Sequence, residues 1–187
     1  MSRNRQLVAK SASRVDLRPL EETDYPALFR AGMSAKDGYR WRYRGATVDI
    51  ESFVRSLYAG TAAQFMVVDR VDGHAYGLVA AYSRQDDLGH CYIAFQRSSQ
   101  RRSAGQMYEG IFRFIDFLFD SSPLRKIYAE IPLYNEEVVG VGLITPFRLE
   151  GVLVDHDYHR GSYHDRRIFA LYRKEWQSWA QGIRGWF

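Results

Sequence analysis

The chain is poor in the features that mark several large classes of protein. It contains one cysteine, Cys91, among 187 residues, so no disulfide can form within it. A lone cysteine is typical of a reducing compartment. The sequence has no run of roughly 20 apolar residues, the length that a membrane-spanning helix needs, and its first residues lack the apolar centre of a secretory signal. These absences predict a soluble, cytoplasmic protein with no membrane partner.

Most of the chain also lacks an excess of one charge sign. The formal net charge is +4, from 26 basic and 22 acidic residues. Four of the basic residues, Arg3, Arg5, Lys10 and Arg14, lie within the first 14 positions, where there is no acidic residue, so the rest of the chain is neutral. Nucleic-acid-binding domains normally present a concentrated basic face, and a neutral body therefore argues against a nucleic-acid partner. We expect residues 1–13 to form a disordered basic tail.

What the chain does have is enough apolar material for one core. It is 46% hydrophobic and 15% aromatic, and it is too short for two comfortable domains. No repeat or linker interrupts residues 14–178, which we interpret as a single domain. Residues 179–187 form an aromatic extension that includes Trp186 and Phe187, and we expect it to pack on the body or on a second copy of the chain in a homodimer.

The hydrophobic pattern predicts a mixture of helices and strands. Ile50, Phe53, Val54 and Leu57 recur at helical spacing, whereas the apolar runs around residues 64–95 have the short lengths and turn residues of strands. Strands are expected near residues 15–20, 64–69, 75–83, 90–95, 126–132, 148–159 and 163–176, and helices near 25–33, 50–57 and 107–119, with a weak helix at 135–145. This order predicts an α/β (α+β) fold with a mixed, mostly antiparallel sheet of about seven strands and helices on both faces.

Small residues follow the third strand of the expected meander, where the 107–119 helix begins. Ser103, Ala104 and Gly105 would let the backbone come close to a bulky ligand. Because the start of a helix carries unsatisfied N–H groups and the positive end of the dipole, that ligand is expected to be an anion. An ordinary helix start made of small residues would have the same sequence.

Taken together, these segments resemble the GNAT superfamily of acyl-CoA-dependent N-acyltransferases, and most closely its ribosomal-protein alanine N-acetyltransferase branch. The resemblance covers nearly all of residues 15–176, and it is carried by the following segments: VDLRPLEETDYPALF, the Gln100-x-x-Ser103-x-Gly105 loop with Glu109 beyond it, Asn135, FRLEG and GSYHDRRIFALYRKEW. It implies the GNAT fold, acetyl-CoA as co-substrate and no metal. It also implies a cofactor-binding set of Gln100, Arg101, Arg102, Ser103, Ala104, Gly105 and Asn135, with Ser103 standing where the family usually has glycine.

The same resemblance implies that the acceptor amine attacks the thioester directly in a ternary complex. Many relatives carry a proton-donating tyrosine in the helix after Asn135, but Gly142 occupies that position here, so Tyr134 or a water is the expected substitute. Glu130 on the preceding strand is the candidate general base, and His90 is a weaker one; a structural role for Glu130 is equally consistent with the sequence. Without a strong base, an α-amino group with a pKa near 8 is favoured over a lysine near 10.4.

The segment between the first strand and the meander is the expected wall of the acceptor site. Tyr39, Trp41, Arg42 and Tyr43 alternate aromatic and basic side chains, which can stack on a flat or carboxylated acceptor. A solvated strand edge with its aromatics tucked inward is the alternative interpretation. This segment favours a small-molecule amine over the alternative acceptor, a protein N-terminus.

Two further features of the sequence bear on two other interpretations, a metal site and a non-catalytic domain. Asp155, His156, Asp157, His159 and His164 are grouped near the end of the chain, but on a strand His156 and His159 would point to opposite faces, which argues against a metal site. Because Ser103 and Gly142 depart from the family pattern, a non-catalytic CoA-binding domain is the third interpretation.

Overall fold

A seven-stranded sheet forms the centre of the computed structural model, which describes residues 13–34, 38, 43, 46–98, 104–139 and 145–183. The strand order is β1-β2-β3-β4-β5-β7-β6, and only β4 and β5 run parallel. The strands are β1 (Val15–Arg18), β2 (Thr61–Asp69), β3 (Ala75–Gln85), β4 (His90–Arg97), β5 (Lys126–Pro132), β6 (Arg148–His159) and β7 (Ser162–Tyr172). The α-helices are α1 (Tyr25–Gly32), α2 (Ile50–Tyr58), α3 (Ala104–Ser121), α4 (Glu136–Val139) and α6 (Arg173–Ile183). The expected mixed, mostly antiparallel fold is confirmed.

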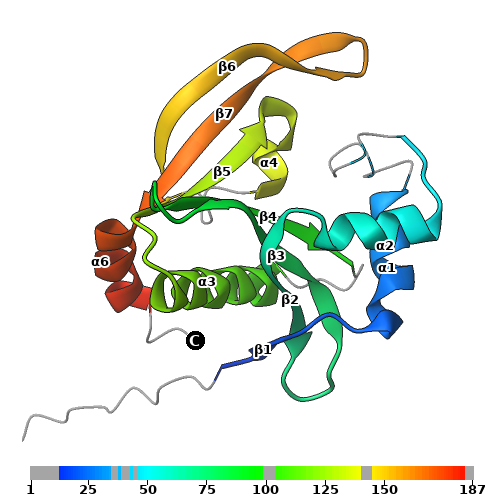
Figure 1. The fold of residues 1–187 in the computed structure, drawn as a ribbon, viewed down its shortest axis with the longest axis horizontal. Coiled ribbons are helices and arrows are strands. Elements are labelled where there is room, and N and C mark those ends of the chain that lie inside the picture. The colour runs from blue at the N-terminus through cyan, green and yellow to red at the C-terminus, as the bar shows by residue number, and fades with distance from the viewer. Residues whose placement is uncertain are drawn as a thin grey trace, which may run out of the picture.

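Helices cover both faces of this sheet, as Figure 1 shows. Alternate residues of a strand point to opposite faces, so β2 contributes to two separate cores. Met66 and Val68 pack with α1 and α2, whereas Val67 packs with α3. Gly110 of α3 faces Val67 so closely that a Cβ at this position would lie 2.4 Å from Val67 Cγ1. The helix can therefore approach the sheet this closely only with glycine at position 110.

The end of the last strand differs from the sequence-based expectation. Residues 173–176 were expected to continue a strand, but β7 ends at Tyr172 and α6 begins at Arg173. Trp176 and Trp179, one helical turn apart, both pack on Phe112 of α3, with ring centroids 5.7 and 5.0 Å away. Packing on α3 thus outweighs the strand-like sequence. Trp186 and Phe187 lie outside the described residues.

The segment after β5 is described as far as Val139. A 3-10 turn, η3 (Leu133–Asn135), leads into α4 (Glu136–Val139). The carbonyl of Val139 accepts a hydrogen bond from Tyr108 Oη of α3 at 3.0 Å, which fastens α4 to the longer helix. Residues 140–144, including Gly142, lie outside the described part of the chain.

Candidate active site

The two parallel strands at the centre of the sheet separate along their length. Their pairing covers residues 90–92 of β4 and 126–128 of β5 and ends at the pair formed by Tyr92 and Tyr128. Beyond this pair, β4 stays bonded to β3 as far as Arg97, and β5 stays bonded to β7 as far as Pro132. We call the resulting gap the fork and the Tyr92–Tyr128 pair its vertex. The fork opens toward the carboxyl ends of both strands, where ligands commonly bind in α/β sheets.

The N-terminus of α3 lies at the open end of the fork, because β4 leads into it. Residues 99–103, including Gln100, Arg101, Arg102 and Ser103, lie outside the described residues, so the structure does not place most of the predicted cradle. It does place Gly105, which is exposed; among the described residues, a Cβ there would meet the guanidinium of Arg14, at 3.5 Å from the nearer nitrogen. The described part of the helix start thus fits a bulky anion.

Arg14 is held in this position by a buried carboxylate that the sequence reasoning used only as part of a motif. Glu109 is fully buried in the second turn of α3. Its oxygens accept hydrogen bonds from Ser13 Oγ at 2.8 Å, from the Arg14 backbone N at 3.0 Å and from Arg14 Nε at 3.3 Å. An acidic residue inside an apolar helical stripe was the available signal. Glu109 therefore fastens the segment before β1 to α3 and places a cation beside Gly105.

Three tyrosines lie side by side at the vertex on the sheet face opposite α3. The centroids of Tyr92 and Tyr128 are 5.1 Å apart, and those of Tyr82 and Tyr92 are 5.7 Å apart. We call these three residues the tyrosine row. Lys126 Nζ lies 4.4 Å from the centre of the Tyr128 ring and donates to Glu150 Oε2 at 2.8 Å, while His90 packs edge-on against Tyr128. The sequence analysis did not identify this row, although its members occupy alternate positions of expected strands.

Glu130 lies on the same face as the tyrosine row, two residues beyond the vertex. Its Oε2 accepts from Arg166 NH1 at 2.9 Å, and Arg166 Nε and NH2 donate to the two oxygens of Asp157 at 2.9 and 2.5 Å. Burial, and then the charge of Glu130, raise the pKa of Tyr92, which indicates that the two side chains are close. Two carboxylates and one guanidinium therefore form a chain that ends at the fork. Sequence reasoning named Glu130 but missed Arg166.

The structure also describes three other predicted site residues, Tyr134, Asn135 and Tyr43. Tyr134 lies in η3, and its ring is 4.5 Å from that of His159 and 5.4 Å from that of His164, so the β6–β7 hairpin holds it. Asn135 ends η3 and is half-buried. Tyr43 packs on Phe53 of α2 and donates a hydrogen bond to Ser56 Oγ, contacts that match the inward-facing alternative.

Tyr39, Trp41 and Arg42 lie outside the described residues. Ala104 is the first residue of α3. The predicted acceptor wall is therefore represented in the structure by Tyr43 alone.

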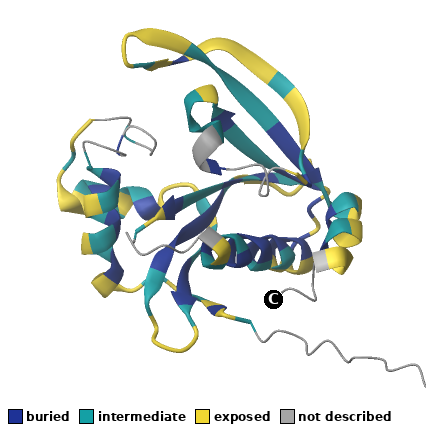
Figure 2. Cartoon of the chain, turned by 180° about the vertical axis from the view of Figure 1, so that it is seen from behind, coloured by how far each residue is buried: buried dark blue, intermediate teal, exposed yellow. Residues whose placement is uncertain are grey.

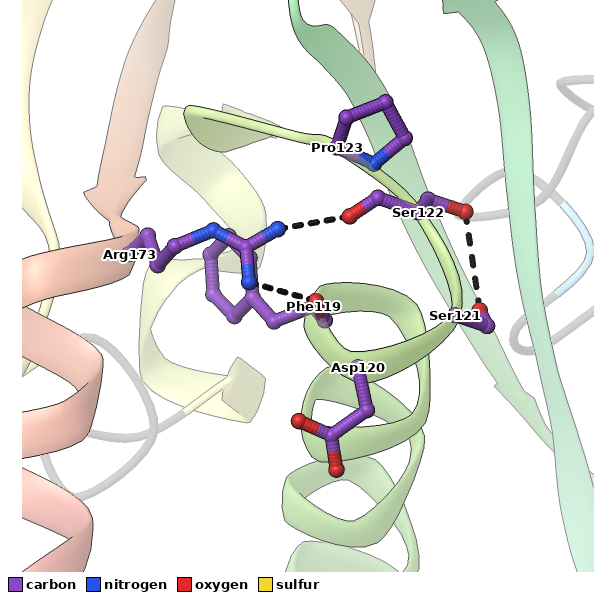
Figure 3. Close-up of a pocket in the computed structure, with 6 residues that line it drawn as sticks. All are labelled: Phe119, Asp120, Ser121, Ser122, Pro123 and Arg173. Carbon is purple, nitrogen blue, oxygen red and sulfur yellow. Dashed lines mark hydrogen bonds between the residues drawn. The ribbon is translucent and has the colours of Figure 1, made fainter.

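Two further features of the molecule are structural. Cys91 is fully buried on the α3 face, and burial raises the pKa of its thiol to about 11, so its interpretation as a buried strand residue is confirmed. A depression at the C-terminal end of α3 is lined by Phe119, Asp120, Ser121, Ser122, Pro123 and Arg173 (Figure 3). There Arg173 donates hydrogen bonds to the carbonyls of Phe119, Ser122 and Leu124, which satisfies the end of the helix. This depression lies at the end of α3 away from the fork.

The described residues lack two features. They contain no group of three or more His, Cys, Asp or Glu side chains arranged to hold a metal ion. None of the described helices is both long and apolar enough to span a membrane.

A forked sheet with a helix N-terminus at its open end offers backbone N–H groups and the positive end of a helix dipole to an anionic ligand. The sequence matches the acetyltransferase (GNAT) domain over residues 14–142, more than half of the chain. The protein therefore belongs to the GNAT acetyltransferases. No curated protein matches the sequence.

Several solved structures share the fold at low sequence identity. The spermidine N-acetyltransferase of Vibrio cholerae, in complex with CoA and spermine, is 19% identical, with a TM-score of 0.75 over 88% of this chain and 99% of that one. An acetyltransferase of the GNAT family from Bacillus anthracis is 17% identical, with a TM-score of 0.70 over 86% and 96% of the two chains. Another structure of the Vibrio cholerae enzyme, at 19% identity and a TM-score of 0.71 over 90% and 98%, is in complex with manganese ions. At these identities the similarity establishes the fold.

Proposed function

We propose that the protein moves an acetyl group from acetyl-CoA to the primary amine of a small molecule, by direct attack within a ternary complex in the cytoplasm. The observation that carries this proposal is the fork, which leads from the start of α3 to a polar vertex. When bound, acetyl-CoA supplies an acyl group activated as a thioester. The backbone from residue 100 to residue 105 would hold its diphosphate, with Arg14 as an added cation and Asn135 on the far side of the fork.

Glu130 is the proposed proton acceptor at the vertex. In the described part of the chain, its Oε1 has no hydrogen-bond partner, while Oε2 is held by Arg166. Oε1 is therefore the atom that would receive the proton of the acceptor amine. Tyr134 is the proposed donor to the leaving group, although a thiol with a pKa near 8.5 can also leave as the anion, so the loss of a donor costs only about 10²-fold in rate.

The nature of the acceptor rests on less direct support. The name of the Vibrio cholerae neighbour, spermidine N-acetyltransferase, favours a small-molecule amine. The resemblance to the ribosomal-protein alanine branch favours a protein N-terminus as the alternative acceptor, and a homodimer remains a prediction.

Release of free thiol from acetyl-CoA tests these acceptors. A panel of aliphatic amines, aromatic amines and short peptides with free N-termini should show turnover with amines above the peptide background. Turnover confined to peptides would establish the alternative. Saturable CoA binding without any turnover would indicate a non-catalytic domain.

Substitution of Gly105 tests the donor site separately. Gly105→Val places a branched side chain where the backbone should approach the diphosphate, so the Kd for CoA should rise roughly tenfold or more, as measured by calorimetry. Gly182→Val in α6 is the matched control, because no described atom outside its own helix backbone lies within 4 Å of a Cβ at Gly182. An unchanged Kd for the Gly105 variant, in a folded protein, would contradict the cradle.

A further inference from the structure

The hydroxyl of Tyr92 at the vertex differs from two other phenols on the same face of the sheet. Tyr128 Oη donates a hydrogen bond to Glu150 Oε2 at 3.0 Å, and the Tyr172 hydroxyl donates to the other oxygen of that carboxylate. Within the described part of the chain, no group accepts from Tyr92 Oη or donates to it. The side chain is half-buried. Because a half-buried phenol usually finds a partner, this hydroxyl is available to a ligand.

Neighbouring rings fix the position of the Tyr92 phenol. Its centroid is 5.1 Å from that of Tyr128, with the planes at 27°, and 5.7 Å from that of Tyr82, with the planes at 31°. Since β4 lies between β3 and β5, these two rings flank Tyr92 on opposite sides. His90 packs against it edge-on, at 6.1 Å. A donor held in this way needs little reorganisation when a ligand binds.

The course of the fork brings a ligand to Tyr92. Tyr92 is the last residue of β4 that pairs with β5, so it lies at the closed end, and α3 begins beyond the open end. Residues 93–97 of β4 separate the two ends by about 17 Å, at about 3.3 Å per residue. Ala94, the next residue on the Tyr92 face, carries only a methyl group. The far end of a ligand that follows the fork from α3 would therefore lie beside the phenol.

The surroundings of the Tyr92 phenol favour its protonated form. Burial, then the carboxylate of Glu130, then Tyr128 raise its pKa, whereas Lys126 lowers it. The net direction is upward, so the hydroxyl keeps its proton at neutral pH and can donate a hydrogen bond. Glu130 lies on the same face, two residues beyond Tyr128. A hydrogen-bond donor and the proposed proton acceptor thus come from the two strands that meet at the vertex.

We propose that Tyr92 is a catalytic residue whose hydroxyl donates a hydrogen bond to the carbonyl oxygen of the bound thioester. This inference rests on the proposed function. When the amine nitrogen bonds to the carbonyl carbon, the electron pair of the C=O bond moves onto the oxygen, and the phenol stabilises the negative charge that forms there. The pair returns as the carbon–sulfur bond breaks and the sulfur departs. Tyr92 keeps its proton throughout, so this role differs from that proposed for Tyr134, which acts on the sulfur.

A purely structural role for Tyr92 would depend on its ring. Aromatic pairs on neighbouring strands stabilise a sheet through contacts between their rings, and the hydroxyl adds nothing to these contacts. Tyr92→Phe keeps the ring between Tyr82 and Tyr128 and removes only the donor. A structural role therefore predicts wild-type behaviour for this variant, whereas the proposed role predicts a loss.

The carbonyl signal of bound acetyl-CoA tests the hydrogen bond without an acceptor amine. Acetyl-CoA labelled with ¹³C at the carbonyl is titrated with the full chain, and a hydrogen bond to the oxygen moves the carbonyl signal downfield. In the wild type the bound signal should lie downfield of the free one, and Tyr92→Phe should return it part of the way while the titration still saturates.

This titration separates the inference from the proposed function. An identical bound signal in the wild type and in Tyr92→Phe would overturn the inference and leave the donor site intact. The absence of any saturable change in the wild type would overturn the proposed function and this inference with it.

Single-turnover kinetics measure the effect on catalysis, with the amine of the panel that turns over fastest. Tyr92→Phe should lower the rate constant for acetyl transfer roughly 10- to 100-fold, because one donor to a developing negative charge is lost. The Kd for acetyl-CoA should stay near the wild-type value, since the full charge on the oxygen exists only after attack.

Tyr172→Phe is the matched control, since it removes the same atom from the same face, where the phenol is already bound to Glu150. Its rate constant and its carbonyl signal should equal those of the wild type. A wild-type rate constant in Tyr92→Phe, or an equal fall in the two variants, would remove Tyr92 from the mechanism.

Discussion

The two faces of β4 and β5 differ completely in chemistry, although the same two strands form both. On the α3 face, Cys91, Ile127 and Ile131 are buried in an apolar core. On the opposite face, the alternating positions hold Tyr92, Tyr128 and the ion-paired carboxylate Glu130. Alternation along a strand therefore separates the residues that stabilise the fold from those available for chemistry, one position apart.

The helices explain why only one face is available. α3 covers the first face, and Figure 2 shows it as a largely buried element. On the other face, α1 and α2 pack over β2 and β3 through Met66, Val68 and Leu78 and do not extend over the vertex. Charged side chains left half-exposed there are paired with one another, because an unpaired charge in such a site is costly. Substitutions on the two faces should accordingly have separable effects.

The largest expected effect is a loss of stability on the α3 face. Phe114 of α3 is 1% exposed, so Phe114→Ala should cost about 3–5 kcal/mol in the free energy of unfolding, measured by urea denaturation. Phe117, in the same helix but 39% exposed, is the matched control, and its replacement by alanine should cost about 1–2 kcal/mol.

The difference between the two faces would be contradicted if Phe114→Ala changed the binding of the amine or of CoA. At a temperature where the variant is folded, its KM for the amine and its affinity for CoA should equal those of the wild type. A change in either constant would show that the two faces are coupled.

A smaller, pH-dependent effect is expected from Glu150 on the open face. Its hydrogen bond from Lys126, then that from Tyr172, lower the pKa of its carboxyl below the ordinary value of 4.5. A lowered pKa in the folded state contributes stability above pH 4.5 that disappears as the pH falls through the lowered value. Wild-type stability should thus decline between pH 5 and pH 3 by about 1 kcal/mol or less through this group, since the pair is partly exposed.

Urea denaturation at several pH values checks this sign. Glu150→Gln should flatten the decline, whereas Glu51→Gln on the exposed surface of α2 should leave it unchanged. Parallel curves for the wild type and Glu150→Gln would show that the cluster around Lys126 contributes nothing through this carboxyl.

The smallest expected effect concerns the chemical labelling of Cys91 on the buried α3 face. Because burial raises the pKa of the Cys91 thiol to about 11, almost no thiolate is present at pH 8. A thiol reagent should label none of the native protein in minutes and one equivalent in urea. Rapid labelling of the native protein would mean that the α3 face opens at β4.

Much of the fold was predictable because its signals are local. The helical spacing of Ile50, Phe53 and Leu57 predicted α2, and the 126–132 run predicted β5 with the observed bounds. The end of β7 was predicted wrongly, and the contacts that hold Arg173 against the end of α3 join residues more than 50 positions apart in the chain. Periodicity carries no information about such contacts.

The candidate site was also predicted only in part from the sequence. Glu130 and Tyr134 were named from the resemblance to relatives, and their roles remain predictions. The partners of Glu130 were missed because Asp157 meets Arg166 through a β-bulge in β6, where Asp155 adopts a φ of 48° and the register shifts between Leu153 and Asp157. Simple alternation from Leu153 gives no warning of this shift.

By itself, the sequence determined the order of the strands and of the helices before β7, the mixed fold class and the small residues at the start of α3, because each depends on neighbours within a few positions. Only the tertiary structure decided where β4 and β5 part, which side chains meet at the vertex, and how Asp157, Arg166 and Glu130 come together. Those arrangements depend on strand register and helix packing between distant segments, which no local pattern encodes.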